Sequence, residues 1–376
     1  MDFAQFKQEV IEYSKTIGID KIGFTTASTF DEMKNRLIRQ QELQYHSGFE
    51  EPDIEKRVNP SLLMDKPRSI ISIALAYPSK MKVRVVSKKG ERRGIFCRAS
   101  WGKDYHHVLK DRLQKLEEFI HARIPEAICK SMVDTGELVD RAVAQRAGIG
   151  WSGKNCSIIT PEFGSYVYLG EMITNLPFEP DEPMEDRCGS CNKCVDVCPT
   201  GALIQGGQLD AQKCIAFLTQ TKGFLADEYR EKLGNRLYGC DTCQTVCPEN
   251  KGKDFHFHEE MEPDPEVAKP LLRPLLFISN REFKEKFGPV SGSWRGKKPI
   301  QRNAIIALAH YKDESAINDL IKVMTTDPRP VIRGTAAWAL GKIGGKESVS
   351  ALEDASVQEK DEKVLAEIEK GLSIIE

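Results

Sequence analysis

Hydrophobic positions in the first part of the chain follow two different spacings. In two segments, apolar residues recur every three to four positions, which is the spacing of an amphipathic helix; these segments span residues 3–17 and 108–120. Elsewhere, apolar residues form short runs of strand length near turn-forming residues; these runs span residues 70–77, 156–160 and 166–169. The pattern predicts an α/β or α+β domain over residues 1–180 and leaves the order of its strands open.

A longer pattern repeats near the end of the chain. Residues 302–308 and 333–340 have similar sequences at an offset of 31 to 32 positions, and each is followed by a polar turn and another helix-like segment. This predicts a pair of HEAT-like helical hairpins, although the unit is shorter than the usual repeat. Two hairpins bury little core alone, so we expect them to pack on the rest of the chain. The alternative is an unrelated four-helix tail.

Composition and charge narrow the class of protein. Of the 376 residues, 40% are hydrophobic and 29% are charged, and the net charge of −2 gives no global attraction to nucleic acid. The first residues lack the basic and apolar regions of a secretory signal, and no run approaches the ~18 apolar residues of a membrane helix. We therefore expect a cytoplasmic protein with no membrane partner. Because cytoplasmic thiols stay reduced, its 11 cysteines indicate metal binding rather than disulfides.

Eight of these cysteines have the spacing of a two-cluster ferredoxin. Residues 188–199 follow the pattern Cys-x2-Cys-x2-Cys-x3-Cys-Pro, and residues 240–248 follow Cys-x2-Cys-x3-Cys-Pro. In such proteins the last cysteine of a run binds the other [4Fe–4S] cluster, and Cys214 supplies the ligand that the second run lacks. The first cluster is thus predicted to use Cys188, Cys191, Cys194 and Cys247, and the second to use Cys198, Cys214, Cys240 and Cys243.

Structural zinc is the alternative for these cysteines, because zinc sites also contain Cys-x2-Cys pairs, but the four-cysteine run ending in proline is untypical of them.

Together with this cluster module, the sequence predicts a multi-domain protein. An α/β (α+β) catalytic domain covers residues 1–180, a ferredoxin-like two-cluster module covers 181–258, and an all-α HEAT-like domain covers 259–376. Clusters carry electrons, so another domain must receive them.

Several segments in the middle of the chain resemble epoxyqueuosine reductases. The HEAT-like tail and the cysteine runs are similar to that family as well, and the combination is more specific than any single motif. The resembling segments are residues 133–136 (VDTG), 141–160 (RAVAQRAGIGWSGKNCSIIT), 164–172 (GSYVYLGEM), 214–219 (CIAFLT) and 239–248 (GCDTCQTVCP).

The resemblance implies a reaction and its cofactors. Members of the family reduce epoxyqueuosine to queuosine, the last step of queuosine biosynthesis, at the wobble position of tRNAs for Tyr, His, Asn and Asp. They use cobalamin, two [4Fe–4S] clusters and an external electron donor. Removing the epoxide oxygen needs two electrons at carbon and protons on the oxygen. By resemblance Asp134 is the proton donor, and we expect burial against the corrin to raise its pKa; alone, it would be read as a turn aspartate.

The cobalamin site is also implied by the resemblance, since the sequence has no DxHxxG motif. Tyr105 and His106 are candidates for lining the same cavity, or else ordinary polar residues at a helix start. The residues expected to bind cobalamin are Arg57, Cys97, Asp134, Ile158, Leu169, Asp241 and Thr242.

Two segments of the chain are strongly basic, although the net charge of the whole chain is −2. Residues 269–312 contain ten Lys and Arg against two acids, and residues 80–112 contain eleven against three. Phosphate contacts provide most of the affinity for nucleic acid, and a wobble base must be unstacked into a pocket to be read. The alternative is a solvated basic face. We expect tRNA to contact Lys222, Arg281, Arg295, Lys297 and Lys298.

Two other functions fit part of the sequence. A corrinoid iron–sulfur reductase of a small molecule would use the same cofactors but would not need the basic helical tail. A non-catalytic electron-transfer scaffold would explain the clusters and repeats but would leave residues 1–180 without a role. The sequence therefore favours an oxidoreductase that modifies tRNA.

Overall fold

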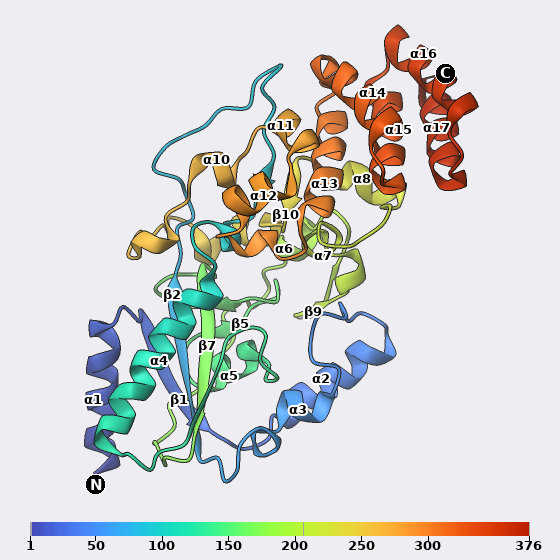
Figure 1. The fold of residues 1–376 in the computed structure, drawn as a ribbon. Coiled ribbons are helices and arrows are strands. Elements are labelled where there is room, and N and C mark those ends of the chain that lie inside the picture. The colour runs from blue at the N-terminus through green and yellow to red at the C-terminus, as the bar shows by residue number, and fades with distance from the viewer. Residues whose placement is uncertain (1, 206, 376) are drawn as a thin grey trace. The chain divides into compact units, whose positions relative to one another are not determined.

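The computed structural model describes residues 2–205 and 207–375 (Figure 1). These residues form two compact units, each built from segments that alternate along the chain. The predicted cluster module contributes to both units, and the boundaries 1–180, 181–258 and 259–376 stay a prediction. Unit 1 contains Met1–Lys80, Lys103–Cys214 and Asp241–Glu262, and unit 2 contains Met81–Gly102, Ile215–Cys240 and Pro263–Glu376.

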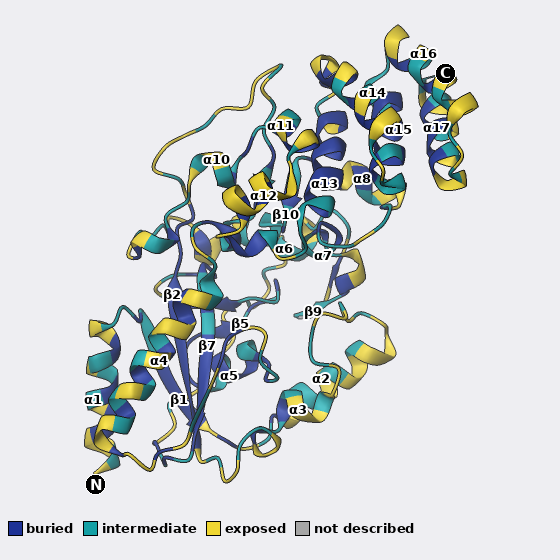
Figure 2. Ribbon diagram, viewed as in Figure 1, coloured by how far each residue is buried: buried dark blue, intermediate teal, exposed yellow. Residues whose placement is uncertain are grey.

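Unit 1 is built on a four-stranded antiparallel sheet with the order β1-β2-β7-β4. Every residue of β2 is buried, which explains why its sequence is an uninterrupted apolar run rather than an alternating one. Figure 2 shows this central strand in dark blue. The strands are β1 (Lys21–Thr26), β2 (Ser69–Ala76), β4 (Cys129–Met132) and β7 (Val167–Thr174).

Helices cover both faces of this sheet (Figure 1). A side chain at Gly23 would overlap the carbonyl oxygen of Ala147, just after α5. Gly23 pairs with Ser72, and Ser72 pairs with Glu171. Directly paired residues point to the same face, so Ser72 and Glu171 face α5. The covering helices are α1 (Phe3–Thr16) and α4 (Tyr105–Arg123) on one face and α5 (Asp140–Arg146) on the other.

The elements predicted from hydrophobic spacing are largely confirmed. Residues 3–17, 70–77 and 108–120 correspond to α1, β2 and α4. The prediction of a strand over 156–160 is wrong in extent, since β6 (Ile158–Ile159) has only two residues and pairs with β5 (Trp151–Ser152). Cys156 has a positive φ of 63°, a conformation that an extended strand does not adopt.

The rest of unit 1 consists of helices and short strands, two of which carry cysteines of the two runs. Helices α6 and α9 pack against each other and occupy equivalent positions in the two runs, around Cys194 and Cys243. The elements are α2 (Asp31–Glu42), α3 (Ile54–Val58), α6 (Lys193–Asp196), β8 (Leu203–Gln205), β9 (Gln208–Leu209) and α9 (Thr242–Thr245), with 3-10 helices at Pro60–Leu62, Ala211–Lys213, Pro248–Asn250 and Glu259–Met261.

Unit 2 is helical except for one short parallel strand pair, β3 (Ile95–Phe96) and β10 (Arg236–Tyr238). None of the described helices is long and apolar enough to cross a membrane. The helices are α7 (Ile215–Leu218), α8 (Asp227–Leu233), α10 (Pro265–Ala268), α11 (Leu272–Phe277), α12 (Asn280–Phe287), α13 (Lys297–His310), α14 (Ile317–Thr326), α15 (Pro330–Ile343), α16 (Lys346–Gln358) and α17 (Glu362–Ile375), with 3-10 helices at Arg98–Ser100, Ser291–Ser293 and Glu314–Ala316.

The predicted repeat corresponds to two helical hairpins in unit 2. Helices α13 and α15 carry the similar sequences, and α14 and α16 are their partners. Helix α13 is almost entirely buried (Figure 2) because it packs against α8, α11 and β10. The expectation that the hairpins pack on other segments is thus confirmed within this unit. Helix α17, which packs on α15, was not predicted.

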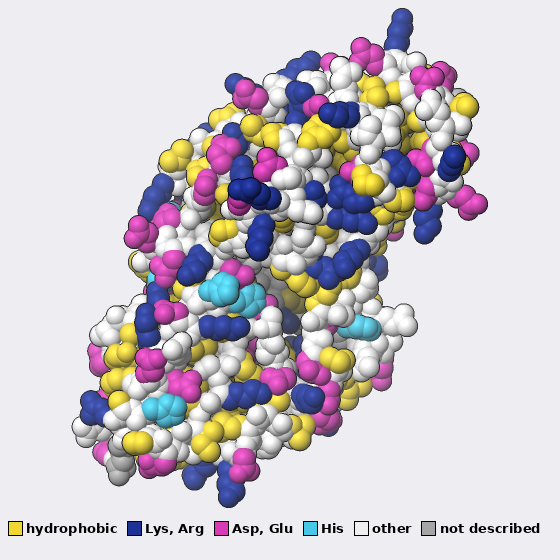
Figure 3. Space-filling view, viewed as in Figure 1, with side chains coloured by type: hydrophobic (Ala, Val, Ile, Leu, Met, Phe, Trp, Pro, Cys, Tyr) yellow, Lys and Arg dark blue, Asp and Glu magenta, His cyan; other side chains and the backbone are white. Residues whose placement is uncertain are grey.

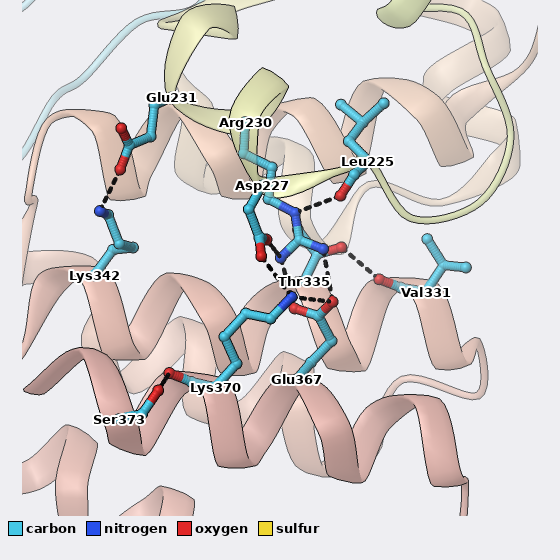
Figure 4. A network of polar contacts seen from close by, with 10 residues as sticks. All are labelled: Leu225, Asp227, Arg230, Glu231, Val331, Thr335, Lys342, Glu367, Lys370 and Ser373. Atoms are coloured by element: carbon cyan, nitrogen blue, oxygen red, sulfur yellow. Dashed lines mark hydrogen bonds and ion pairs between the residues drawn. The ribbon is translucent and has the colours of Figure 1, made fainter.

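A buried ion pair joins the last helix to α8 (Figure 4). The two terminal guanidinium nitrogens of Arg230 donate to the Glu367 carboxylate, at 2.6 and 2.7 Å. The side chains are only 2% and 9% exposed. The Arg230 Nε atom also donates to the carbonyl oxygen of Leu225. This two-pronged geometry adds orientation as well as energy, so it fixes α17 against α8.

Candidate active site

Asp134 lies in the turn that leads from β4 to α5. Its φ of 51° is uncommon for a residue other than glycine and often marks a functional position. The backbone N–H of Asp134 donates to Oδ2 of Asp140, the first residue of α5, at 3.0 Å. The Asp134 side chain is 58% exposed, so the turn presents its carboxylate at the surface.

Two residues at the start of α4 contact this carboxylate. The Tyr105 hydroxyl donates to Oδ2 of Asp134 at 2.9 Å, and Nε2 of His106 lies 3.3 Å from the same oxygen. The Tyr105 ring stacks on Tyr168 of β7 with centroids 4.6 Å apart, and Tyr168 packs against Tyr77 at 4.4 Å. A row of aromatic rings therefore holds Tyr105 in place, and Tyr105 and His106 are not merely polar residues at a helix start.

Neighbouring charges and hydrogen bonds determine the protonation states of His106 and Asp134. Burial alone would lower the pKa of His106, but its hydrogen bonds to Asp104 and Asp134 and their charges raise it to about 9. The pKa of Asp134 is lowered, chiefly by its hydrogen bond with His106. The expectation that the pKa of Asp134 is raised is wrong for this structure, because the hydrogen bond with His106 lowers it by more than burial raises it. At neutral pH the site holds a His106 imidazolium beside an Asp134 carboxylate.

Two more acidic side chains lie behind the Asp134 turn, between the sheet and α5. Glu171 is fully buried on β7, and Asp140 begins α5. Burial raises the pKa of Glu171 well above its usual range and that of Asp140 to about 6. The two carboxyl groups interact, although no described residue lies at good hydrogen-bond geometry to the Glu171 oxygens. Sequence reasoning missed both residues. An acid inside the apolar run of β7 was the available signal.

The ligands predicted for the first cluster gather in unit 1. Cys188, Cys194 and Cys247 lie close enough for the charge of one to act on another. The N–H of Cys191 donates to the carbonyl oxygen of Cys188 in the same loop. The structure thus places Cys247, from the second run, beside the first run. No disulfide joins any of the 11 cysteines, all of which are described.

The four cysteines predicted to bind the second cluster are divided between the segments of unit 1 and unit 2. Cys198, Cys214 and Cys243 belong to unit 1, and Cys240 is the last residue of its segment in unit 2. Burial alone would raise the pKa of Cys198, but hydrogen bonds from backbone amides, led by that of Leu203, hold it below its usual range. Hydrogen bonds to sulfur are a feature of cluster sites.

The residues predicted to bind cobalamin lie on several elements of unit 1, except Cys97. Ile158 of β6 and Leu169 of β7 belong to an apolar cluster between the sheet and α5. Arg57 lies on α3, and burial is the main cause that lowers its pKa. Asp241 and Thr242 begin α9; Cys97 follows β3 in unit 2, where its sulfur would overlap any side chain at Gly239.

The tight turn between β5 and β6 contains a buried polar group that sequence reasoning missed. Asn155 is 6% exposed, and its Oδ1 accepts a hydrogen bond from the backbone N–H of Ser157. Its Nδ2 atom has no acceptor within the described part of the chain. Because a buried donor without an acceptor is unfavourable, this turn fits a ligand that carries carbonyl groups.

The residues predicted to contact tRNA all lie in unit 2. The loop that carries Lys222 is fixed by hydrogen bonds from a buried arginine. The guanidinium of Arg302 on α13 donates to the carbonyl oxygens of Thr221 and Gly223, at 2.8 and 2.9 Å. Burial lowers the pKa of Arg302 to about 10, so it stays a cation at neutral pH. Lys222 between these residues is exposed.

Gln220 contacts Arg295, another residue of the predicted tRNA set, and the neighbouring Trp294. Trp294 Nε1 donates to Gln220 Oε1 at 2.8 Å, and Arg295 Nε donates to the Gln220 carbonyl oxygen at 3.2 Å. Lys222, Trp294 and Arg295 therefore lie on one surface. Figure 3 shows dark-blue Lys and Arg side chains gathered over the region labelled α8 and α13 in Figure 1.

The other residues predicted to contact tRNA are bonded to neighbouring groups or are only half-exposed. The Lys297 ammonium donates to the carbonyl oxygen of Ile278 at 2.9 Å, and burial is the main cause that lowers its pKa. Arg281 forms an exposed ion pair with Glu285, one turn along α12. Lys298 is half-exposed at the start of α13.

Three protein families match parts of the chain. They are a 4Fe-4S double cluster binding domain over residues 187–250, epoxyqueuosine reductase QueG (DUF1730) over residues 57–135, and HEAT repeats over residues 296–373. The first match decides in favour of iron–sulfur over structural zinc, and the third decides against an unrelated helical tail.

Known proteins are similar over the whole length. An epoxyqueuosine reductase of Bacillus anthracis is 73% identical over 375 residues, covering 100% of this chain and 99% of the relative. A crystal structure of epoxyqueuosine reductase with an epoxyqueuosine-modified tRNA-Tyr stem loop has a TM-score of 0.97 and 70% identity, with 100% of both chains covered. A Bacillus subtilis structure with the Asp134 catalytic loop swung out of the active site has a TM-score of 0.97 and 68% identity, again with 100% of both covered. This chain therefore belongs to the epoxyqueuosine reductase family.

Proposed function

We propose that this protein reduces epoxyqueuosine to queuosine at the wobble position of tRNA, with tRNAs for Tyr, His, Asn and Asp as its substrates. The observation that carries the proposal is the exposed Asp134 carboxylate, held by Tyr105 and His106 in a chain whose full-length relatives are epoxyqueuosine reductases. A relative bound to an epoxyqueuosine-modified tRNA stem loop supports the tRNA substrate over a small molecule or a scaffold role.

The proposed reaction adds two electrons and two protons to the epoxide. The two carbon–oxygen bonds break, a carbon–carbon double bond forms, and the oxygen leaves as water. His106 and Asp134 together hold one proton on the line between Nε2 and Oδ2. We assign Asp134 the role of proton donor: it takes this proton from His106 and passes it to the departing oxygen. Tyr105 keeps the Asp134 carboxylate in place through its hydroxyl.

Two [4Fe–4S] clusters are proposed to carry the electrons. The first would be held by Cys188, Cys191, Cys194 and Cys247, and the nearness of Cys188, Cys194 and Cys247 supports this set. The second would be held by Cys198, Cys214, Cys240 and Cys243. An external electron donor and a location in the cytoplasm belong to the same proposal.

Cobalamin is proposed as the cofactor that receives these electrons. When bound, it would supply a low-valent cobalt that donates electrons to the substrate carbon. The unpaired Nδ2 of Asn155 supports the fit, because the corrin carries amide side chains whose oxygens accept hydrogen bonds. The residues proposed to hold it are Arg57, Cys97, Asp134, Ile158, Leu169, Asp241 and Thr242.

The surface around Lys222, Trp294 and Arg295 is proposed to bind the tRNA backbone, with Arg281, Lys297 and Lys298 as further contacts. Arg295 and Lys222 offer cations for phosphate. The exposed Trp294 ring, with Arg295 4.9 Å above it, offers a face on which an unpaired base can stack. Arg302 and Gln220 would keep these groups in place.

A reconstitution experiment tests the proposed function. The protein is purified anaerobically, loaded with iron, sulfide and cobalamin, reduced, and mixed with a stem loop containing epoxyqueuosine. Mass spectrometry of the nucleosides should show queuosine, formed by loss of one oxygen atom, and about eight irons per chain. Unchanged epoxyqueuosine with a fully loaded protein would overturn the proposal.

A further inference from the structure

A buried polar layer lies behind the turn that carries Asp134. Glu171 projects from β7 into this layer and is fully buried. It pairs directly across the sheet with Met132, the last residue of β4, so it lies just ahead of the turn. Asp140 follows the turn and accepts a hydrogen bond from the Asp134 N–H through Oδ2 at 3.0 Å. Three carboxyl groups therefore lie along one path from the core to the surface.

This arrangement requires one shared proton. Glu171 and Asp140 interact closely, and two ionised carboxylates are strongly unfavourable in a dry layer. Asp140 already accepts a hydrogen bond from the Asp134 N–H, whereas neither carboxyl oxygen of Glu171 has a hydrogen-bond partner of good geometry among the described residues, so the proton belongs on Glu171. Burial raises the pKa of Glu171 well above its usual range, whereas Asp140 reaches only about 6. The titratable and charged groups facing Asp140 are Asp134, Glu171 and, from α3, Arg57.

We propose that Glu171 is a positioning residue for Asp134. After a small rotation of the Glu171 side chain, its neutral carboxyl group donates a hydrogen bond to the Asp140 carboxylate, and Asp140 in turn fixes the backbone N–H of Asp134. The pair thereby holds the left-handed backbone of Asp134, a conformation that persists only when its surroundings enforce it. The inference rests on the proposed role of Asp134 and adds two residues, Glu171 and Asp140, that fix the conformation of its turn.

Hydrogen exchange of the protein without cofactors or tRNA tests this role. In Glu171→Leu, Asp140 loses its donor, and exchange in residues 133–139 should be about tenfold faster. Glu171→Gln keeps a neutral donor and should retain the protection of wild type. Ser72→Ala removes a neighbouring buried hydroxyl from the same face and should leave the turn unchanged. Equal exchange in the wild type and both Glu171 variants would overturn the proposal.

Infrared spectroscopy covers the case in which Glu171→Leu fails to fold, which would appear as faster exchange in β1 and β2 as well. At about pH 7.5, wild type should show the carbonyl band of a protonated carboxylic acid, and Glu171→Gln should lack it. An identical band in both proteins, or none in wild type, would overturn the proposal. Both measurements are made without turnover, so an inactive wild-type enzyme would count against the proposed function and leave this result standing.

Discussion

Nε2 of His106 lies 3.3 Å from Oδ2 of Asp134, the same oxygen that accepts a hydrogen bond from Tyr105. The hydrogen bond with Asp104 and, after it, this contact raise the pKa of His106, and this contact is the chief cause that lowers the pKa of Asp134. It also means that the proton available to the site is stored on a histidine whose partner is the exposed carboxylate. The pair, rather than Asp134 alone, therefore sets the pH range in which the site holds a proton.

The His106 pair predicts a definite pH dependence of stability. The pKa of His106 rises from 6.5 to about 9 on folding, so its contribution is fully present below pH 6.5 and is lost as pH rises toward 9. Urea unfolding of wild type and His106→Gln at several pH values should show a stability difference that shrinks over this window. A difference that stays constant from pH 6 to pH 10 would contradict the assigned pKa.

The crossed ligand sets predict how cysteine substitutions combine. Cys188→Ala and Cys247→Ala should each remove the same cluster, so that the double variant retains about four irons per chain, as each single variant does. Cys198→Ala combined with Cys247→Ala should retain almost none. Iron is measured after anaerobic reconstitution, with Cys129→Ala, outside both sets, as the control. Additive loss in the Cys188 and Cys247 double variant would mean that the two residues serve different clusters.

The basic surface of unit 2 predicts a graded effect on tRNA binding. Lys222→Ala and Arg295→Ala should each weaken binding and reduce the salt slope of the affinity by about one, because each loses a phosphate contact. Lys297→Ala should have a smaller effect, since its ammonium donates to the Ile278 carbonyl. The exposed Lys346 at the start of α16 is the matched control. Equal slopes for Lys222→Ala and Lys346→Ala would place the tRNA elsewhere.

The Arg230–Glu367 pair predicts a large, local cost in stability. Glu367→Gln leaves Arg230 buried beside a weaker partner. Arg230→Met leaves Glu367 with only the longer contact to Lys370, at 3.5 Å, and should cost about 3–5 kcal/mol. Lys342→Ala removes a partly exposed ion pair with Glu231 and should cost less than about 1 kcal/mol. Denaturant unfolding compares them, and similar values for Arg230→Met and Lys342→Ala would show that the buried pair contributes little.

Hydrophobic spacing was sufficient to predict α1, α4 and β2, because each buries one continuous apolar face or run. The cysteine spacing was sufficient for the iron–sulfur module, since cluster ligation tolerates few alternatives. Hydrophobic spacing could not predict the extent of β6, because the left-handed turn at Cys156 depends on contacts rather than on local composition. Helix α17 was not predicted because it follows the second repeat unit along the chain and is not itself part of the repeated sequence, although it packs on α15.

The candidate site was predicted less completely than the fold. Asp134 came from family resemblance, and nothing in its immediate sequence indicates that His106 lies beside it. The ion pair forms only when the start of α4 meets the end of β4, and it reverses the expected pKa shift. Asp140 and Glu171 are an ordinary helix-start acid and a strand acid in sequence, and only the pairing of β7 with β4 brings them behind the turn.

Replacing Asp134 with Asn tests the central claim most directly. The amide keeps the size of the side chain but cannot donate an acidic proton. Single-turnover conversion of an epoxyqueuosine stem loop by the loaded enzyme should fall by at least about a hundredfold, while affinity for the stem loop should stay near that of wild type. Conversion at the wild-type rate would contradict the account, and so would a loss of activity explained entirely by lost binding.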